Sequence, residues 1–76
     1  MTYTMPVNQV QFFLDDLLPM EHFNVIFLTS KGEQRQYDGF LTPSKTKDSL
    51  VRFETLTGQY KSFKIDSVLS LTKENS

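Results

Sequence analysis

The chain has 76 residues, a formal net charge of −1 and no cysteine. Without cysteine there are no disulfides and no thiolate metal sites, and a single histidine leaves a zinc ion without enough ligands. The near-neutral charge argues against binding to long nucleic acid, whose phosphates favour a clearly basic surface. No apolar run reaches the ~18 residues of a membrane span, so we expect one small cytoplasmic domain.

A helical pattern runs over residues 7–18. Asn8 is the predicted N-cap, Gln11 completes a capping box, and Pro19 is expected to end the helix. Residues 1–6 and 73–76 are expected to be tails, with packing of Tyr3 and Met5 against the rest of the chain as the alternative for the first segment. The apolar residues that recur on one stripe at helical spacing are Val10, Phe13, Leu14, Leu17 and Leu18.

From residue 23 the apolar period changes to about two, which predicts β-strands up to residue 72. Turns are expected at Ser30–Glu33, which contains Gly32, and at Thr57–Gly58. Gly39 is expected to form a bulge or bend, and Pro43–Ser49 is the longest polar loop. The expected strands are 23–29, 35–42, 50–56, 59–64 and 68–72. One N-terminal helix and five short strands predict a mainly β fold. We expect a small five-stranded antiparallel barrel of the SH3-like or Sm-like type, because closure removes exposed strand edges.

Basic and aromatic residues gather on the predicted third and fourth strands. Strand alternation puts Tyr60 and Lys64 on one face, and Arg52 lies on the paired strand. With Arg35, these residues form a predicted site that could stack a base and hold a phosphate. An alternative is that Glu54 neutralises Arg52 and leaves an ordinary solvated face.

Asp66 lies in the short predicted turn that follows the fourth strand. Its carboxylate is expected to accept backbone N–H bonds within that turn. Ligand binding by Asp66 is the second interpretation.

The first and last expected strands carry apolar residues on both faces. Ile26 and Leu28 point away from the face of Phe23, Val25 and Phe27, and we expect Leu69 and Leu71 to point away from Val68. Because a strand that is apolar on both faces is buried on both, a homo-oligomer interface is predicted at Ile26, Leu28, Leu69 and Leu71. Burial of this second face under the helix is the alternative.

The sequence carries no pattern typical of a catalytic site. Asp15 and Asp16 are adjacent on the helix and point about 100° apart, so they cannot act as a carboxylate pair. His22 has no nucleophile beside it, and no glycine run has phosphate-loop spacing. We therefore expect no enzyme activity, no cofactor and no metal.

Three segments carry a family resemblance: residues 27–35, residues 51–54 and the stretch Tyr60–Val68, which reads YKSFKIDSV. Over residues 23–72 the chain resembles the Sm-like SH3-barrel family of small bacteriophage proteins, which is related to the barrel of WYL-type regulators. It departs from that family in its longer Pro43–Ser49 loop and in Tyr60, where tryptophan is more usual. The resemblance implies a phage origin, an Sm-like fold and a tendency to form rings.

These observations favour a non-enzymatic phage accessory protein, acting in host takeover or counter-defence in the host cytoplasm. Its predicted role is to sequester a host factor, first of all a nucleotide-type signal held by an Sm-like oligomer. One alternative is an inhibitor that binds a host protein directly. The other is an Sm-like RNA- or DNA-binding protein, against which the overall charge argues.

Overall fold

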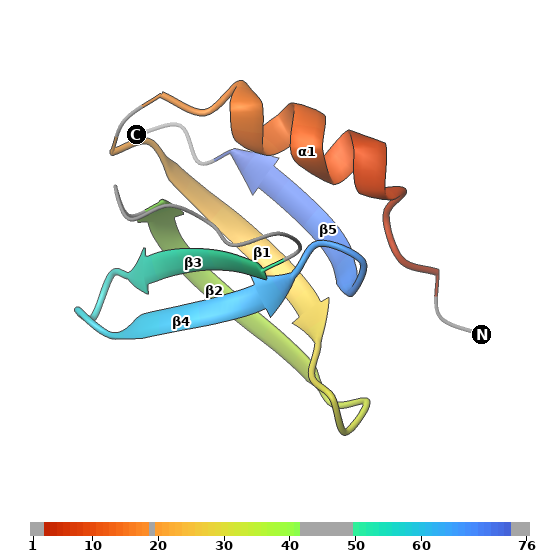
Figure 1. Ribbon diagram of the computed structural model, residues 1–76. Helices are drawn as coiled ribbons and strands as arrows, with labels where there is room; N and C mark the ends of the chain where they lie inside the picture. The colour runs from red at the N-terminus through yellow and green to blue at the C-terminus, as the bar shows by residue number, and fades with distance from the viewer. Residues whose placement is uncertain (1–2, 19, 42–49, 74–76) are drawn as a thin grey trace.

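The computed structural model describes residues 3–18, 20–41 and 50–73. It consists of one helix followed by five strands (Figure 1). Each predicted strand is present and its ends lie within one residue of the predicted positions, so a mainly β fold with one short helix is confirmed. In chain order the elements are α1 (Val7–Asp15), β1 (His22–Leu28), β2 (Gln34–Leu41), β3 (Leu50–Thr55), β4 (Tyr60–Lys64) and β5 (Val68–Lys73).

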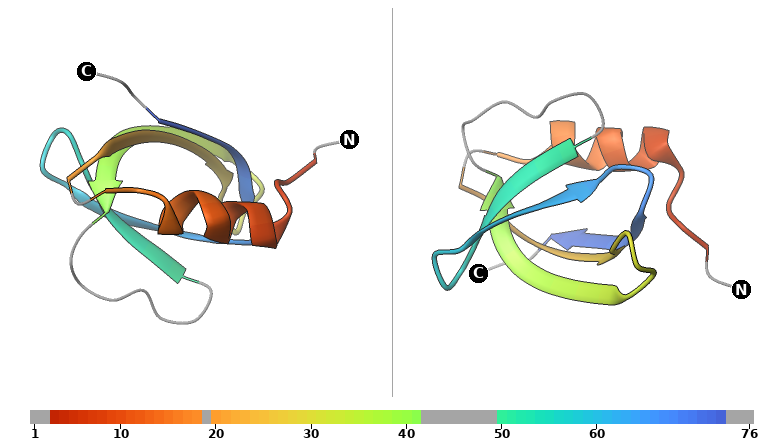
Figure 2. Two further views of the ribbon diagram at one scale, coloured as in Figure 1. Left: turned by 90° about the horizontal axis from the view of Figure 1, so that it is seen from above. Right: turned by 60° about the horizontal axis from the view of Figure 1, so that its bottom comes forward.

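The five strands form one antiparallel sheet in the order β4-β3-β2-β1-β5. The expected closed barrel is not observed, because β4 and β5 are the two edges and are not paired with each other in the described part of the chain. Residues 65–67 nevertheless lead the chain from one edge strand to the other. So short a connection brings the two edges together at this point and requires the sheet to curl, as Figure 2 shows.

Gly39 allows two strands to approach closely on one side of β2. Gly39 pairs with Phe23 on β1 and with Thr55 on β3, and neither pairing shows the register shift that a bulge would cause. A Cβ atom at Gly39 would collide with the carbonyl oxygen of Glu54. The expected bulge at Gly39 is therefore absent, and glycine is required there by the neighbouring backbone.

The turn between β1 and β2 and the turn between β3 and β4 make the same hydrogen bonds. Each begins with a threonine, Thr29 or Thr55, whose N–H donates to the carbonyl oxygen four residues later at 2.8 Å. The threonine hydroxyl oxygen accepts the N–H of that same fourth residue at 3.1 Å. Gly32 and Gly58 then adopt φ values of 80° and 88°, which glycine reaches without the strain that most side chains would cause. The two turns predicted from these glycines are confirmed.

Aromatic rings fill the inner face of the curled sheet. The ring of Phe63 lies 5.6 Å from those of Phe27 and Phe53, and the ring of Phe23 lies 5.9 Å from that of Phe53. The buried apolar residues are Val10, Phe23, Val25, Phe27, Val51, Phe53, Phe63, Ile65, Val68 and Leu71. They show that the inner faces of β1, β3 and β4 follow the predicted alternation.

Helix α1 lies across one end of the curled sheet (Figure 2). Val10 is fully buried, and the ring of Phe13 meets that of Phe23 edge-on at 6.4 Å. No helix in the described residues is both long and apolar enough to span a bilayer.

The helix begins at Val7, as the helical pattern indicates, but it ends at Asp15, three residues before the expected end at residue 18. Its N-cap is Pro6, whose carbonyl oxygen accepts the N–H groups of Gln9 and Val10. The expected N-cap at Asn8 is therefore wrong, because Asn8 lies inside the helix and no side chain caps it. After the helix, Leu18 and Glu21 are joined by two hydrogen bonds. The Glu21 N–H donates to the carbonyl oxygen of Leu18, and the Leu18 N–H donates to the Glu21 carboxylate. The predicted effect of Pro19 lies outside the described residues.

Two residues assigned to the tails belong to the fold. Met5 packs against the core, and its N–H donates to the carbonyl oxygen of Val68 at 2.7 Å. Lys73 is the last residue of β5, and its ammonium donates to the Asp16 carboxylate at 2.7 Å, joining the end of the sheet to the end of the helix.

A β-bulge in β5 overturns the expected facing of Leu71. Val25 pairs with Leu71 and Phe27 pairs with Val68, so Leu69 is an extra residue without a register partner. The bulge turns both Val68 and Leu71 inward, although simple alternation would separate them. Leu71 is therefore a core residue, 8 % exposed, and does not share an outward face with Leu69.

Candidate functional site

The outward side of the β3–β4 hairpin brings together three of the predicted ligand-binding residues. We call this surface the β3–β4 outer face; its residues are Leu50, Arg52, Glu54, Tyr60, Ser62 and Lys64. Arg52 pairs with Ser62, so Tyr60 and Lys64 are its diagonal neighbours across the strands. Diagonal neighbours on one face lie about 7–8 Å apart, within reach of long side chains. Tyr60, Arg52 and Lys64 therefore share one exposed surface.

The two cations of this surface are not neutralised within the described residues. Neither Arg52 nor Lys64 forms an ion pair there, and the ion pairs that are present lie elsewhere, at Arg35–Glu33 and Lys73–Asp16. Glu54 pairs in register with Tyr60 and makes no bond to Arg52. Within the described residues, Glu54 therefore does not neutralise Arg52, in contrast to the alternative interpretation of the sequence.

Arg35 lies apart from this surface. It pairs with Phe27 at the start of β2, two strands away from β4, and its guanidinium lies 3.5 Å from the Glu33 carboxylate. Lys61 is also separate, because alternation turns it to the other face of β4, where its ammonium lies 5.6 Å from the centre of the Tyr37 ring. The structure does not bring Arg35 to Arg52 and Lys64.

Asp66 is exposed in the turn between β4 and β5. The expected capping bonds from its carboxylate are not seen among the described residues. Ser67 closes the turn instead, because its N–H and its hydroxyl both donate to the carbonyl oxygen of Lys64, at 3.0 and 2.8 Å. Asp66 also lies outside the lining of the neighbouring pocket.

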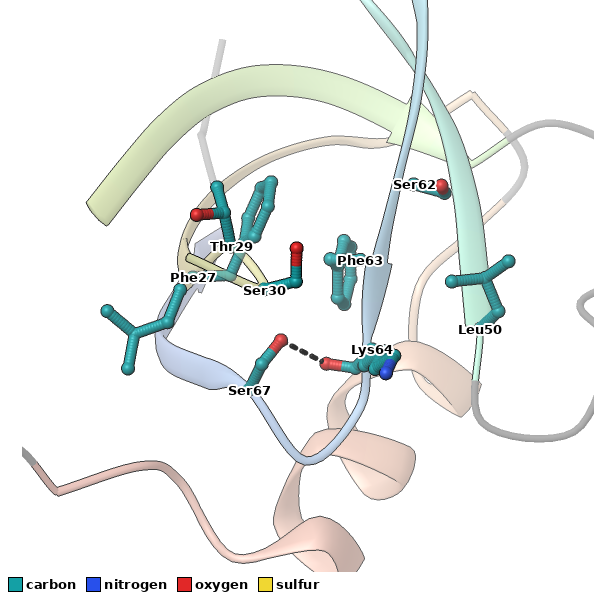
Figure 3. Close-up of a pocket in the computed structure, with 9 residues that line it drawn as sticks. Phe27, Thr29, Ser30, Leu50, Ser62, Phe63, Lys64 and Ser67 are labelled. Carbon is teal, nitrogen blue, oxygen red and sulfur yellow. Dashed lines mark hydrogen bonds between the residues drawn. The ribbon is translucent and has the colours of Figure 1, made fainter. Parts of the chain in front are cut away.

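A pocket of about 310 Å³ opens where β4 ends, and we call it the β4 pocket (Figure 3). Phe27 and Phe63, stacked at 5.6 Å, line its inner part. Lys64 belongs both to the pocket and to the β3–β4 outer face, as do Leu50 and Ser62. The remaining lining residues are Leu28, Thr29, Ser30 and Ser67. Pocket and outer face are therefore continuous at Lys64.

Sequence reasoning did not find the β4 pocket. Its lining comes from the end of β1, the start of β3, the end of β4 and the following turn, which are far apart in the chain. No local spacing signals such a site, since serine and leucine occur throughout β-proteins. The pocket depends on the curl that brings the end of β1 opposite β4.

The residues predicted to form an oligomer interface do not share one surface. Ile26 is half-buried on the outer side of the sheet, in register with Gln36 and Ser70. Leu28 lines the β4 pocket, Leu69 is the half-buried bulge residue, and Leu71 lies in the core. Ile26 and Leu69 are the two that remain available to a subunit contact.

The comparisons with known proteins identify no family for this chain. No family model, no curated protein and no solved structure matches it.

Proposed function

We propose that this chain is a non-enzymatic binding protein for a short phosphorylated ligand of the nucleotide type. The observation that carries the proposal is the register of β3 and β4, which sets Arg52 between Tyr60 and Lys64 on one exposed face. The guanidinium of Arg52 can hold a phosphate through two parallel hydrogen bonds, and Lys64 can add a second charged contact. Tyr60 is 63 % exposed and offers a ring on which a base can stack.

The size of this surface favours a short ligand over a polymer. Lys64 lies four positions after Tyr60, which corresponds to about 13 Å along a strand. Two cations lie within that length, and Glu54 lies opposite Tyr60 at its end. This arrangement supports contacts to one or two phosphates, whereas tracking a long strand requires a continuous basic surface.

The proposal also includes the type of fold and the biological role of the protein. The five-strand order, the short connection between the edge strands and the helix across one end support an open SH3-like or Sm-like barrel. With the resemblance of residues 23–72, we assign the chain to phage accessory proteins of host takeover or counter-defence. Its role is to sequester a host nucleotide signal as a homo-oligomer in the host cytoplasm.

Titration calorimetry against mononucleotides, dinucleotides and long duplex DNA tests this function. Arg52→Gln and Lys64→Gln should each weaken nucleotide binding about tenfold or more, since a charged hydrogen bond contributes about 1.5–3 kcal/mol. Long duplex DNA should bind weakly.

Arg35→Gln is the matched control, because it removes the same charge from a residue outside the β3–β4 outer face. It should bind like the parent. Absence of binding to every nucleotide, or equal losses in Arg35→Gln and Arg52→Gln, would overturn the proposal.

A further inference from the structure

The β4 pocket adds a second ring-binding place to the β3–β4 outer face. The order along β4 is Tyr60, then Ser62 with Arg52 opposite, then Lys64, and the pocket opens beside Lys64. The two cations therefore lie between the exposed ring of Tyr60 and the aromatic-lined pocket. Figure 3 shows this pocket with Lys64 among its lining residues.

The pocket combines apolar walls with free hydroxyl groups. Leu28 and Leu50 add apolar surface to that of the stacked Phe27–Phe63 pair. Within the described residues, the Ser30 and Ser62 hydroxyls make no hydrogen bond, whereas the Ser67 hydroxyl donates to the backbone carbonyl oxygen of Lys64. Such a lining suits a flat ring that is apolar on its faces and carries polar groups at its edge, as a nucleobase does.

The volume of the pocket limits what can enter it. About 310 Å³ is at the lower end of the range of small-ligand sites, which runs from about 300 to 1,000 Å³. One ring system fits this space and a complete dinucleotide does not. The phosphates of a ligand whose ring enters the pocket must remain outside, beside Lys64.

We infer that the ligand is a dinucleotide, with one base in the β4 pocket, its phosphates on Lys64 and Arg52, and its second base on Tyr60. This inference rests on the proposed function, since it uses the same two cations. It adds that two bases are recognised, one by enclosure and the other by stacking, and that the pocket determines the preference for a dinucleotide over a mononucleotide.

The test compares a dinucleotide with the corresponding mononucleotide by calorimetry. The parent protein should bind the dinucleotide about tenfold more tightly, because a second buried ring adds apolar contact. Leu50→Ala, which shortens a pocket wall, and Ser30→Leu, which fills the mouth, should remove this preference.

Leu56→Ala is the matched control for Leu50→Ala. Leu56 is 53 % exposed and Leu50 is 42 % exposed, but Leu56 lies in the turn at the other end of the hairpin, outside the pocket. Leu56→Ala should keep the preference for the dinucleotide. In NMR spectra of the parent protein, the dinucleotide should shift the backbone signals of Ser30 and Ser67, and this measurement does not depend on any variant folding.

Equal affinity for the two ligands, or shifts confined to Tyr60 and Arg52, would overturn the pocket inference. Mononucleotide binding that is lost in Arg52→Gln would still support the proposed function in that case. If neither ligand binds the parent protein, both proposals fail.

Discussion

The carbonyl oxygen of Glu54 occupies the space that a Cβ atom of Gly39 would need. The contact fixes how closely β2 and β3 approach at the point where their pairing begins, since Gly39 pairs with Thr55. The close approach of the two strands at this point therefore requires a residue without a side chain.

We expect Gly39→Ala to lower the free energy of unfolding by about 1–3 kcal/mol, because the added methyl group displaces the backbone of β3. Gly32→Asn is the control. Gly32 has nothing within 4 Å of its ideal Cβ position, and asparagine tolerates its φ of 80°. Thermal and urea unfolding measure both variants. A Gly39→Ala protein as stable as the parent would show that β3 moves away at little cost.

Two adjacent phenylalanines of α1 should differ strongly in their contribution to stability. Phe13 is half-buried against Phe23, whereas Phe12 is 78 % exposed. Phe13→Ala should cost about 3 kcal/mol. Phe12→Ala should stay within about 0.5 kcal/mol of the parent, and so should Asn8→Ala, which removes no cap. Equal urea midpoints for the two phenylalanine variants would contradict the packing of the helix.

The ion pair between Lys73 and Asp16 should make stability depend on pH in the alkaline range. The hydrogen bond that the Lys73 ammonium donates to the Asp16 carboxylate raises the pKa of Lys73 above its usual 10.5. A raised pKa means that the pair stabilises the fold at neutral pH, and that this contribution disappears as the pH rises through the folded-state value. The stability difference between the parent and Asp16→Asn should therefore begin to shrink above pH 10.5 and disappear as the pH passes the folded-state pKa of Lys73. It should also be smaller in high salt.

Asp15→Asn is the control for this pair, since Asp15 forms no ion pair within the described residues. Its difference from the parent should show no such alkaline transition. A constant difference for Asp16→Asn between pH 8 and the alkaline limit would rule out a contribution from Lys73.

Self-association should depend on the outer side of β1 and β5. We expect light scattering at micromolar concentration to give several times the chain mass of 8.8 kDa. Leu69→Glu should dissociate the oligomer without unfolding it, because Leu69 is the half-buried bulge residue. Leu71→Ala should lower stability and leave the mass unchanged, since Leu71 lies in the core. A mass near 8.8 kDa at every concentration would contradict this prediction.

Local sequence patterns were sufficient for the strands and two of their turns. Alternation put Phe23, Val25 and Phe27 on the core side of β1, and Gly32 and Gly58 marked two turns because each needs a positive φ. The same alternation, with the pairing of β3 and β4, brought Arg52 to the face of Tyr60 and Lys64. These features depend on neighbours in the chain or on a single hairpin, so the short-range pattern of the sequence is enough to predict them.

Features that depend on distant contacts were decided by the tertiary structure. The bulge at Leu69 turned Leu71 into the core, because pairing with β1 and burial against Val25 outweighed simple alternation. Gly39 proved necessary because β3 crosses it closely, and the β4 pocket arose where the end of β1 meets β4. Each of these features results from packing between segments that are far apart in the chain. Several local conformations are close in free energy for the isolated segments, and the burial of side chains in the folded protein selects one of them.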